Sequence, residues 1–195
     1  MKITKAEFIT SVANEKNFLA TNKPIIAVAG KSNVGKSSLI NMLANQKKLA
    51  RTSVTPGRTR LINYFDFGEF ILADLPGYGF AKVSKEEKTK WANLMESFLA
   101  TQPITLLLSL VDIRHEPTSD DKMMINYLYH YQIPFVLVAT KADKLGKSKI
   151  KPRVKEIASS LKVGFADLTA TSAETGYGKN ELIDLIDKAI NVEKE

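Results

Sequence analysis

The sequence predicts an α/β protein with a doubly wound, mostly parallel sheet of six strands, one antiparallel strand near an edge, and helices on both faces. Two observations carry this prediction. Short continuous apolar runs, such as residues 25–29 and 135–139, are typical of strands that are buried on both faces. These runs alternate along the chain with helical patterns that are apolar on one side, which is the order that builds a parallel sheet between two helical layers.

The expected elements follow from apolar spacing and from turn signals. Gly68 and Glu69 lie between two apolar segments and predict the turn of a β-hairpin. Ser84 and Glu87 match a capping box and predict the start of a helix. The expected strands are 25–29, 61–67, 70–73, 104–111, 135–139 and 165–171. The expected helices are 35–46, one that follows residue 84, 118–131, one through 150–161 and one through 182–190.

Length and composition exclude several classes of protein. The 195 residues are about the size of one domain, so we expect a single domain with residues 1–22 as an extension packed on or beside it. Because cysteine is absent, a disulfide scaffold, a thiolate zinc site and a cysteine nucleophile are excluded. No apolar run reaches the ~18 residues of a membrane helix, and the first residues have no signal-peptide core. We therefore expect a cytoplasmic protein without a membrane span.

The net charge of +7 is distributed unevenly. Residues 16–65 hold nine Lys or Arg and no acid, and residues 141–162 hold eight basic side chains against two acidic ones. Basic patches of this kind attract phosphates and nucleic acids. The alternative, which charge alone leaves open, is a solvated face without a partner.

A phosphate-binding motif follows the first apolar run. It has the pattern G-x-x-x-x-G-K-S between a strand and a helix, as a phosphate loop requires. Its residues are Gly30, Lys31, Ser32, Asn33, Val34, Gly35, Lys36 and Ser37, followed by Ser38. Gly30 and Gly35 permit backbone angles that direct successive N–H groups at one anion, and the helix N-terminus adds its positive end. Lys36 neutralises the outer phosphates, and the Ser37 hydroxyl is a ligand for Mg²⁺.

A second motif, D-x-x-G, follows the predicted hairpin. It consists of Asp74, Leu75, Pro76 and Gly77. Asp74 can hold magnesium from the second side, and the Gly77 N–H can meet a terminal phosphate. Alone, the motif is weak, since an aspartate that caps a loop is common. Downstream of a phosphate loop, it indicates a nucleoside triphosphate site.

Two further motifs follow the last predicted strands, Thr140-Lys141-Ala142-Asp143 and Thr171-Ser172-Ala173-Glu174. Asp143 can accept two hydrogen bonds from guanine, at its ring N–H and its exocyclic amine, and adenine offers no such pair of donors. The stem of Lys141 can lie along the base, and a backbone N–H near Ser172 can meet the guanine carbonyl. Each motif alone could be a helix cap or a turn, but four motifs in this order at strand ends predict a guanine nucleotide site.

The segments GKSNVGKSSLIN, ARTSVTPGRTRLINYF, DLPGYGFAKVSK, VDIRHEP and TKADK resemble the EngB (YihA/YsxC) family of bacterial ribosome-assembly GTP-binding proteins, within the TrmE-Era-EngA-EngB-septin-like GTPase class. The resemblance covers nearly the whole chain. It implies a P-loop NTPase fold with a GTP-binding domain at 23–195, GTP or GDP and Mg²⁺ as ligands, and slow GTP hydrolysis. It also implies a monomer that binds the precursor of the large ribosomal subunit and its rRNA, with a role in cell division.

The resemblance also implies a role for the loop after the first helix, switch I. Thr59 there would bind magnesium directly, as Ser37 does, while Asp74 would act through water. The nucleotide contacts implied in this loop are Gly57, Arg58, Thr59, Arg60 and Leu61. Two positions depart from the family pattern, Lys31 in place of a common arginine and Thr140 in place of the usual asparagine.

The catalytic residues expected for GTP hydrolysis are Lys36, Thr59 and Gly77. Tyr78 follows Gly77, where many related GTPases carry a water-orienting glutamine, so slow turnover is expected. Asn33 is a candidate ligand for K⁺ between the phosphates and switch I, although it could instead only support the turn of the loop. Two other functions stay open at this point, an ATP-dependent kinase or ATPase, and a nucleotide-gated RNA-binding module whose hydrolysis is incidental.

Overall fold

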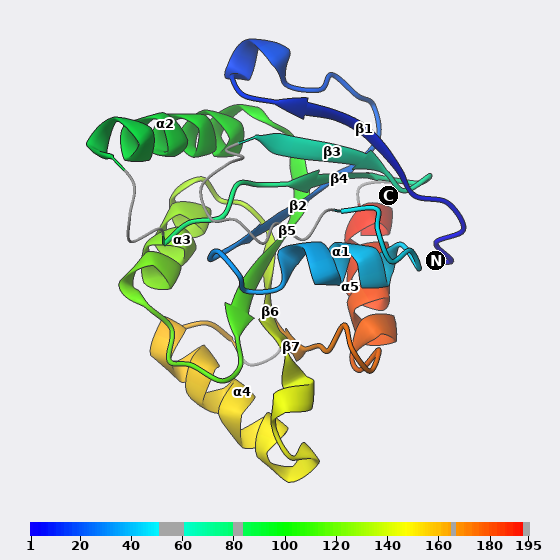
Figure 1. Cartoon of the computed structure of the whole chain (residues 1–195), viewed down its shortest axis with the longest axis vertical. Coiled ribbons are helices and arrows are strands. Elements are labelled where there is room, and N and C mark those ends of the chain that lie inside the picture. Colours follow the sequence, from blue (N-terminus) through cyan, green and yellow to red (C-terminus); the bar gives the residue numbers. More distant parts are fainter. Residues whose placement is uncertain (51–60, 80–83, 165–166, 193–195) are drawn as a thin grey trace.

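The computed structural model describes residues 1–50, 61–79, 84–164 and 167–192. A seven-stranded sheet runs through the molecule in the order β1-β3-β4-β2-β5-β6-β7 (Figure 1). The strands are β1 Glu7–Val12, β2 Ile25–Gly30, β3 Ile62–Asp66, β4 Ile71–Asp74, β5 Ile104–Asp112, β6 Phe135–Thr140 and β7 Leu168–Ala170. The helices are α1 Lys36–Leu43, α2 Lys85–Thr101, α3 Ser119–His130, α4 Lys147–Leu161 and α5 Lys179–Val192, with short 3₁₀ turns η1 Glu15–Asn17 and η2 Ala142–Lys144.

The sheet confirms the predicted fold class. Strands β4, β2, β5, β6 and β7 pair in parallel, and β3 runs antiparallel to both of its neighbours. The expected count of six strands is one too low, because β1 adds to the edge of the sheet beside β3. Most of the β1 side chains are exposed, so the segment lacks the apolar run by which the other strands were predicted.

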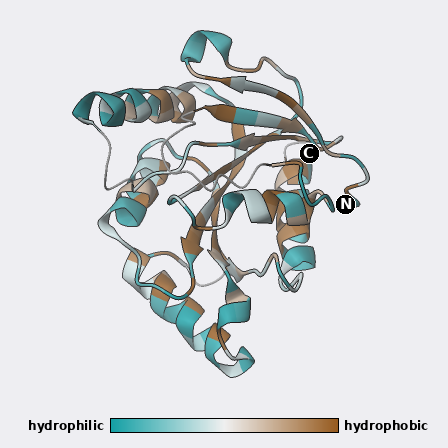
Figure 2. Ribbon diagram, in the orientation of Figure 1, coloured by the Kyte–Doolittle hydropathy of each residue, from teal (hydrophilic) through white to brown (hydrophobic). Residues whose placement is uncertain are grey.

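Two apolar cores lie on opposite faces of the sheet. One combines sheet residues with the inner sides of α2, α3 and α4, and the other combines sheet residues with α1 and α5. In Figure 2 the central strands are mainly brown, whereas α4 is largely teal with brown on part of its surface. Burial on both faces explains why the central strands are continuous apolar runs.

Several predicted boundaries shift by a few residues. The helix expected at 35–46 ends at Leu43. Two residues later, Asn45 takes a left-handed backbone conformation with φ +55°. The strand expected at 165–171 covers Leu168–Ala170 among the described residues. The capping box of Ser84 and Glu87 is present and begins α2. None of the described helices combines the length and the apolar character needed to span a membrane.

Candidate nucleotide-binding site

The phosphate loop joins the end of β2 to the start of α1. Asn33 and Gly35 turn the loop with positive φ angles of +63° and +108°. Gly35 is the N-cap of α1. Because glycine has no side chain, the N–H groups at the positive end of the helix receive no side-chain cap from this position. Gly30 does not share the positive φ angle of Gly35. A Cβ on Gly30 would lie 2.8 Å from a Val34 methyl group and 2.9 Å from the Leu110 Cβ, so the glycine is needed for space.

Lys36 and Asp74 meet at the phosphate end of the site. Asp74 ends β4 and is 8% exposed, and its Oδ1 lies 3.6 Å from the Lys36 Nζ. That distance is too long for a hydrogen bond, and Oδ1 has no hydrogen-bond partner among the described residues. Burial raises the pKa of the Asp74 carboxyl, and the positive charge of Lys36 opposes this effect.

The unpartnered oxygen of Asp74 fits a hard cation. Mg²⁺ takes oxygen ligands and keeps several waters, and one or two carboxylates with substrate phosphates are its usual partners. Within the described part of the chain, no cluster of three or more His, Cys, Asp or Glu could hold a metal by itself. A cation beside Asp74 would therefore need hydroxyl, water and phosphate oxygens, and Ser37 lies next to Lys36 in the first turn of α1.

The chain after β4 continues alongside the phosphate loop. The Leu75 N–H donates to the Val28 carbonyl over 2.9 Å, and the Ser32 N–H donates to the Tyr78 carbonyl over 2.9 Å. Gly77 lies against Ser32, because a Cβ on Gly77 would be 3.3 Å from the Ser32 nitrogen. The two motifs predicted to meet a terminal phosphate are therefore adjacent in space. The carbonyl of Pro76 accepts a hydrogen bond from the indole N–H of Trp91 on α2.

The end of β6 is tied to the phosphate loop by two side chains. The Lys141 Nζ donates to the Asn33 carbonyl over 2.7 Å and also lies 2.9 Å from Oδ2 of Asp112. The hydroxyl of Thr140, which is 4% exposed, lies 2.6 Å from the carbonyl of Val34. Thr140, predicted as a nucleotide contact, thus bonds the backbone of the phosphate loop.

Asp112, at the end of β5, is a site residue that sequence reasoning missed. Burial alone would raise the pKa of its carboxyl, but hydrogen bonds from Arg114 and Lys141 together lower it well below the usual range. The carboxylate therefore stays ionised and holds Lys141 in place. Its position directly after an apolar strand, inside the segment VDIRHEP, is the signal that could have found it.

Asp143 lies in η2 beside the loop that follows β7. The Ser172 hydroxyl donates to its Oδ1 over 2.7 Å, and the Lys144 Nζ lies 2.9 Å from its Oδ2. The hydrogen bonds from Lys144 and then from Ser172 lower the pKa of Asp143. The Ala142 N–H donates to the Thr171 carbonyl over 3.0 Å, so the third and fourth motifs are joined, with Ala173 next along the exposed turn.

Four of the predicted contacts in switch I, Gly57, Arg58, Thr59 and Arg60, lie outside the described residues. Leu61 is described, half-buried, directly before β3. Lys31 lies at the start of the phosphate loop, where its side chain covers Gly79. A Cβ on Gly79 would be 2.6 Å from the Lys31 Cε.

Comparison with known proteins identifies the family. A family model described as "50S ribosome-binding GTPase" matches residues 25–141. A protein of Geobacillus kaustophilus named "Probable GTP-binding protein EngB" is 45% identical over 184 residues, which cover 93% of this chain and 94% of that protein. The chain belongs to the EngB family of GTP-binding proteins. An Exiguobacterium member of the same name is 47% identical over 184 residues, 93% of each chain.

A solved EngB structure supports the same assignment. The crystal structure titled "a probable GTP-binding protein engB" matches with a TM-score of 0.71 and 25% identity, over 86% of this chain and 98% of that one. As an EngB family member with a P-loop, the chain is a GTPase that binds and hydrolyses GTP. The family decides against the ATP-dependent alternative.

Proposed function

We propose that this GTPase is a switch that assists assembly of the large ribosomal subunit, by binding a precursor of that subunit and its rRNA in the GTP state. The observation that carries the proposal is the family description, a GTPase that binds the 50S ribosome, over 25–141. The net charge of +7 supports a phosphate-rich partner, since basic surfaces gain affinity for RNA by releasing counterions. We also propose that the protein acts as a monomer in the cytoplasm, with a role in cell division.

The exposed side of α4 supports an RNA contact. Lys147, Lys149 and Lys151 are exposed, and they form no ion pair with the described residues. They lie in the first turns of α4, where the positive end of the helix makes cations unfavourable, and no acid accompanies them in the first turn. A phosphate-bearing partner would offset this repulsion. Arg153 differs, because Glu116 and Glu156 already pair with it.

In the proposed reaction, each strand-end motif has one task. Lys36 neutralises the phosphate oxygens, Gly77 donates its N–H to the terminal phosphate, and Asp143 accepts hydrogen bonds from guanine. Mg²⁺, bound directly by Ser37 and Thr59 and through water by Asp74, would supply further charge neutralisation at the phosphates. The remaining nucleotide contacts are those of the loops around them: Gly30, Lys31, Ser32, Asn33, Val34, Gly35, Ser38, Gly57, Arg58, Arg60, Leu61, Leu75, Pro76, Thr140, Lys141, Thr171, Ser172 and Ala173. Hydrolysis removes the phosphate that Gly77 meets and so lowers affinity for the subunit.

The test is co-sedimentation of the full chain with ribosomal subunits and their precursors. We expect binding to the large subunit or its precursor with a non-hydrolysable GTP analogue, weaker binding with GDP, and a steep loss with added salt. Association with neither subunit, or association that ignores both nucleotide and salt, would contradict the proposal. Equal binding to naked RNA, with hydrolysis that does not change on binding, would favour the RNA-binding module instead.

A further inference from the structure

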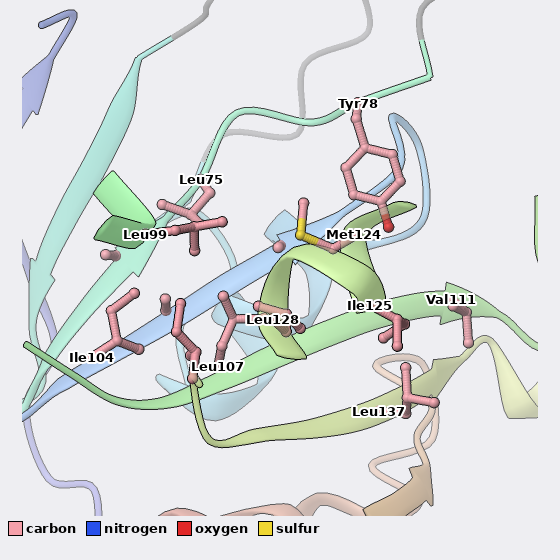
Figure 3. Packing of buried hydrophobic residues seen from close by; sticks show 14 of the residues in the cluster. Leu75, Tyr78, Leu99, Ile104, Leu107, Val111, Met124, Ile125, Leu128 and Leu137 are labelled. Carbon is pink, nitrogen blue, oxygen red and sulfur yellow. The ribbon is translucent and has the colours of Figure 1, made fainter. Parts of the chain in front are cut away.

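Tyr78, the residue that follows Gly77, points into the protein interior. It is 4% exposed, and its ring packs edge-on against Trp91 with centroids 6.3 Å apart. Figure 3 shows its side chain directed into the apolar cluster beside Met124 of α3. A buried ring in this place cannot orient a water as the glutamine of related GTPases does.

The Tyr78 hydroxyl is held by one carboxylate at the start of α3. It donates to Oδ1 of Asp121 over 2.9 Å, in a contact that is buried on both sides. The other oxygen of Asp121 accepts from the N–H and the hydroxyl of Thr118, each over 2.7 Å, which completes the capping box of α3. Asp121, 6% exposed, therefore uses one oxygen for its own helix and one for Tyr78. Removing the hydroxyl would leave a buried carboxylate oxygen without this partner.

The backbone of Tyr78 is held by the phosphate loop. Its carbonyl accepts from the Ser32 N–H over 2.9 Å, and its own N–H donates to the Gly30 carbonyl over 3.4 Å. Together with the bridge between Lys31 and Tyr78, these bonds extend the sheet beyond the end of β4. One residue thus joins the phosphate loop, through its backbone, to α3, through its side chain.

We propose that Tyr78 is a positioning residue for GTP hydrolysis: its bonds to Ser32 and Asp121 hold Gly77 beside the phosphate loop, where the Gly77 N–H meets the terminal phosphate. The tyrosine acts through Gly77 and does not touch the attacking water. Burial, with the charge of Asp121 adding to it, raises the pKa of Tyr78 well above its ordinary value, so the hydroxyl remains a donor at neutral pH. The proposal rests on GTP hydrolysis and is independent of the ribosomal role.

The decisive variant is Tyr78→Phe, which removes the hydroxyl and keeps the ring against Trp91. We expect the single-turnover rate of GTP hydrolysis to fall about tenfold, and the affinity for a non-hydrolysable GTP analogue to fall about threefold to tenfold. The affinity for GDP should stay within about twofold, because GDP lacks the phosphate that Gly77 faces. This split between GTP and GDP distinguishes positioning from a general loss of stability.

Two further variants complete the test. Asp121→Asn can keep its one oxygen for the tyrosine only by placing its NH₂ against the Thr118 N–H, whereas Asp121→Ala loses both contacts. The GTP-to-GDP affinity ratio of the asparagine variant should therefore lie closer to wild type than that of Asp121→Ala. Tyr131→Phe is the control for the loss of a bond between tyrosine and a carboxylate, since the Tyr131 hydroxyl bonds Oε1 of Glu96 over 3.1 Å in an exposed contact away from the phosphate loop. We expect wild-type rates for it.

Two outcomes would overturn the proposal. One is a wild-type rate of hydrolysis together with an unchanged GTP-to-GDP affinity ratio for Tyr78→Phe. The other is an equal loss of GTP and GDP affinity that follows a lowered thermal midpoint, which would make Tyr78 a core residue only.

Discussion

The predicted guanine side and the phosphate side of the site differ in the hydrogen bonding and in the pKa of their carboxylates. Asp143, on the guanine side, has a partner for each oxygen, in Ser172 and Lys144, and these bonds lower its pKa. Asp74, on the phosphate side, is buried with one oxygen unpartnered among the described residues, and burial raises its pKa. Protein donors thus hold the Asp143 carboxylate in one orientation and favour its ionised form. On the phosphate side, the Asp74 oxygen without a hydrogen-bond partner among the described residues would fit a hard cation.

The two sides are joined by side chains from β6. Lys141 and Thr140 both bond the backbone of the phosphate loop, at Asn33 and Val34. The segment that follows β6 therefore helps to fix the conformation of the phosphate loop. This arrangement explains how threonine can serve in place of asparagine at position 140, since its hydroxyl reaches the carbonyl of Val34.

The largest effect should come from breaking the guanine side. We expect Asp143→Asn to lower GTP affinity at least about 100-fold, because two hydrogen bonds to a charged acceptor are lost. The new amide can donate to the oxygen that replaces the guanine amine in xanthine, so xanthosine triphosphate should bind more tightly than GTP. Competition binding with both nucleotides measures the effect. Wild-type GTP affinity in the variant would show that the proposed base contact is wrong.

The second-largest effect should be on binding to the ribosomal precursor, without a change in either side of the nucleotide site. Charge reversal of Lys147, Lys149 and Lys151 on α4 should weaken binding to the large-subunit precursor roughly thirtyfold and reduce its salt dependence. Nucleotide affinity should not change. The matched control reverses the exposed α2 lysines 85, 88 and 90. Equal losses in the two triple variants would mean that net charge, and not the α4 surface, decides binding.

A third effect concerns Asn33, which lies where the two sides meet. Its carbonyl already accepts a hydrogen bond from Lys141, and its backbone is left-handed. Both observations are consistent with a role of Asn33 in supporting the turn of the loop. If its side chain also binds K⁺, potassium should accelerate hydrolysis about tenfold over sodium at equal ionic strength, below the ~10³–10⁵ of an arginine finger. Asn33→Ala should abolish the difference and retain GDP binding. Equal wild-type rates in the two salts, with and without ribosomal subunits, would eliminate the idea.

The smallest effect should be on stability at the phosphate side. Because burial raises the folded pKa of Asp74, the folded state keeps its proton to higher pH than the unfolded chain, and stability is lost as pH rises through that pKa. Asp143, with a lowered pKa, has the opposite sign, and its contribution is lost as pH falls through the folded value. The contribution of Asp74 to folding stability is therefore largest at low pH, and that of Asp143 is largest at higher pH.

The corresponding experiment uses Asp74→Asn without magnesium. We expect the variant to be more stable than wild type at neutral pH, because the raised pKa means that ionised Asp74 is less favourable in the folded chain than in the unfolded one, even with Lys36 beside it. Thermal unfolding in EDTA measures this gain, which should shrink toward acid pH. Asp66→Asn is the control, since Asp66 pairs with Lys23 over 2.8 Å and its loss should not stabilise. A loss of stability on Asp74→Asn would contradict the comparison.

Most of the order of elements and the phosphate-loop motif could be predicted from the sequence because their signals are local. A phosphate loop needs two glycines, a lysine and a hydroxyl at fixed spacing between a strand and a helix, and residues 30–37 meet that requirement. Buried strands need continuous apolar runs, so β2, β5 and β6 were evident. Strand β1 was not, because hydrogen bonds to β3 hold it in place while most of its side chains remain exposed.

The contacts that link the motifs were decided only by the tertiary structure. Lys141 reaches Asn33 across 108 positions, and Tyr78 reaches Asp121 across 43. A side chain's partner at such a separation depends on how helices and strands pack, which no local pattern encodes. The sequence by itself therefore determined which chemical groups gather at the carboxyl ends of the strands. The fold decided that one Asp74 oxygen has no hydrogen-bond partner among the described residues, that Asp143 has partners for both of its oxygens, and that the Tyr78 side chain is buried, because burial and hydrogen bonding are properties of the packed chain.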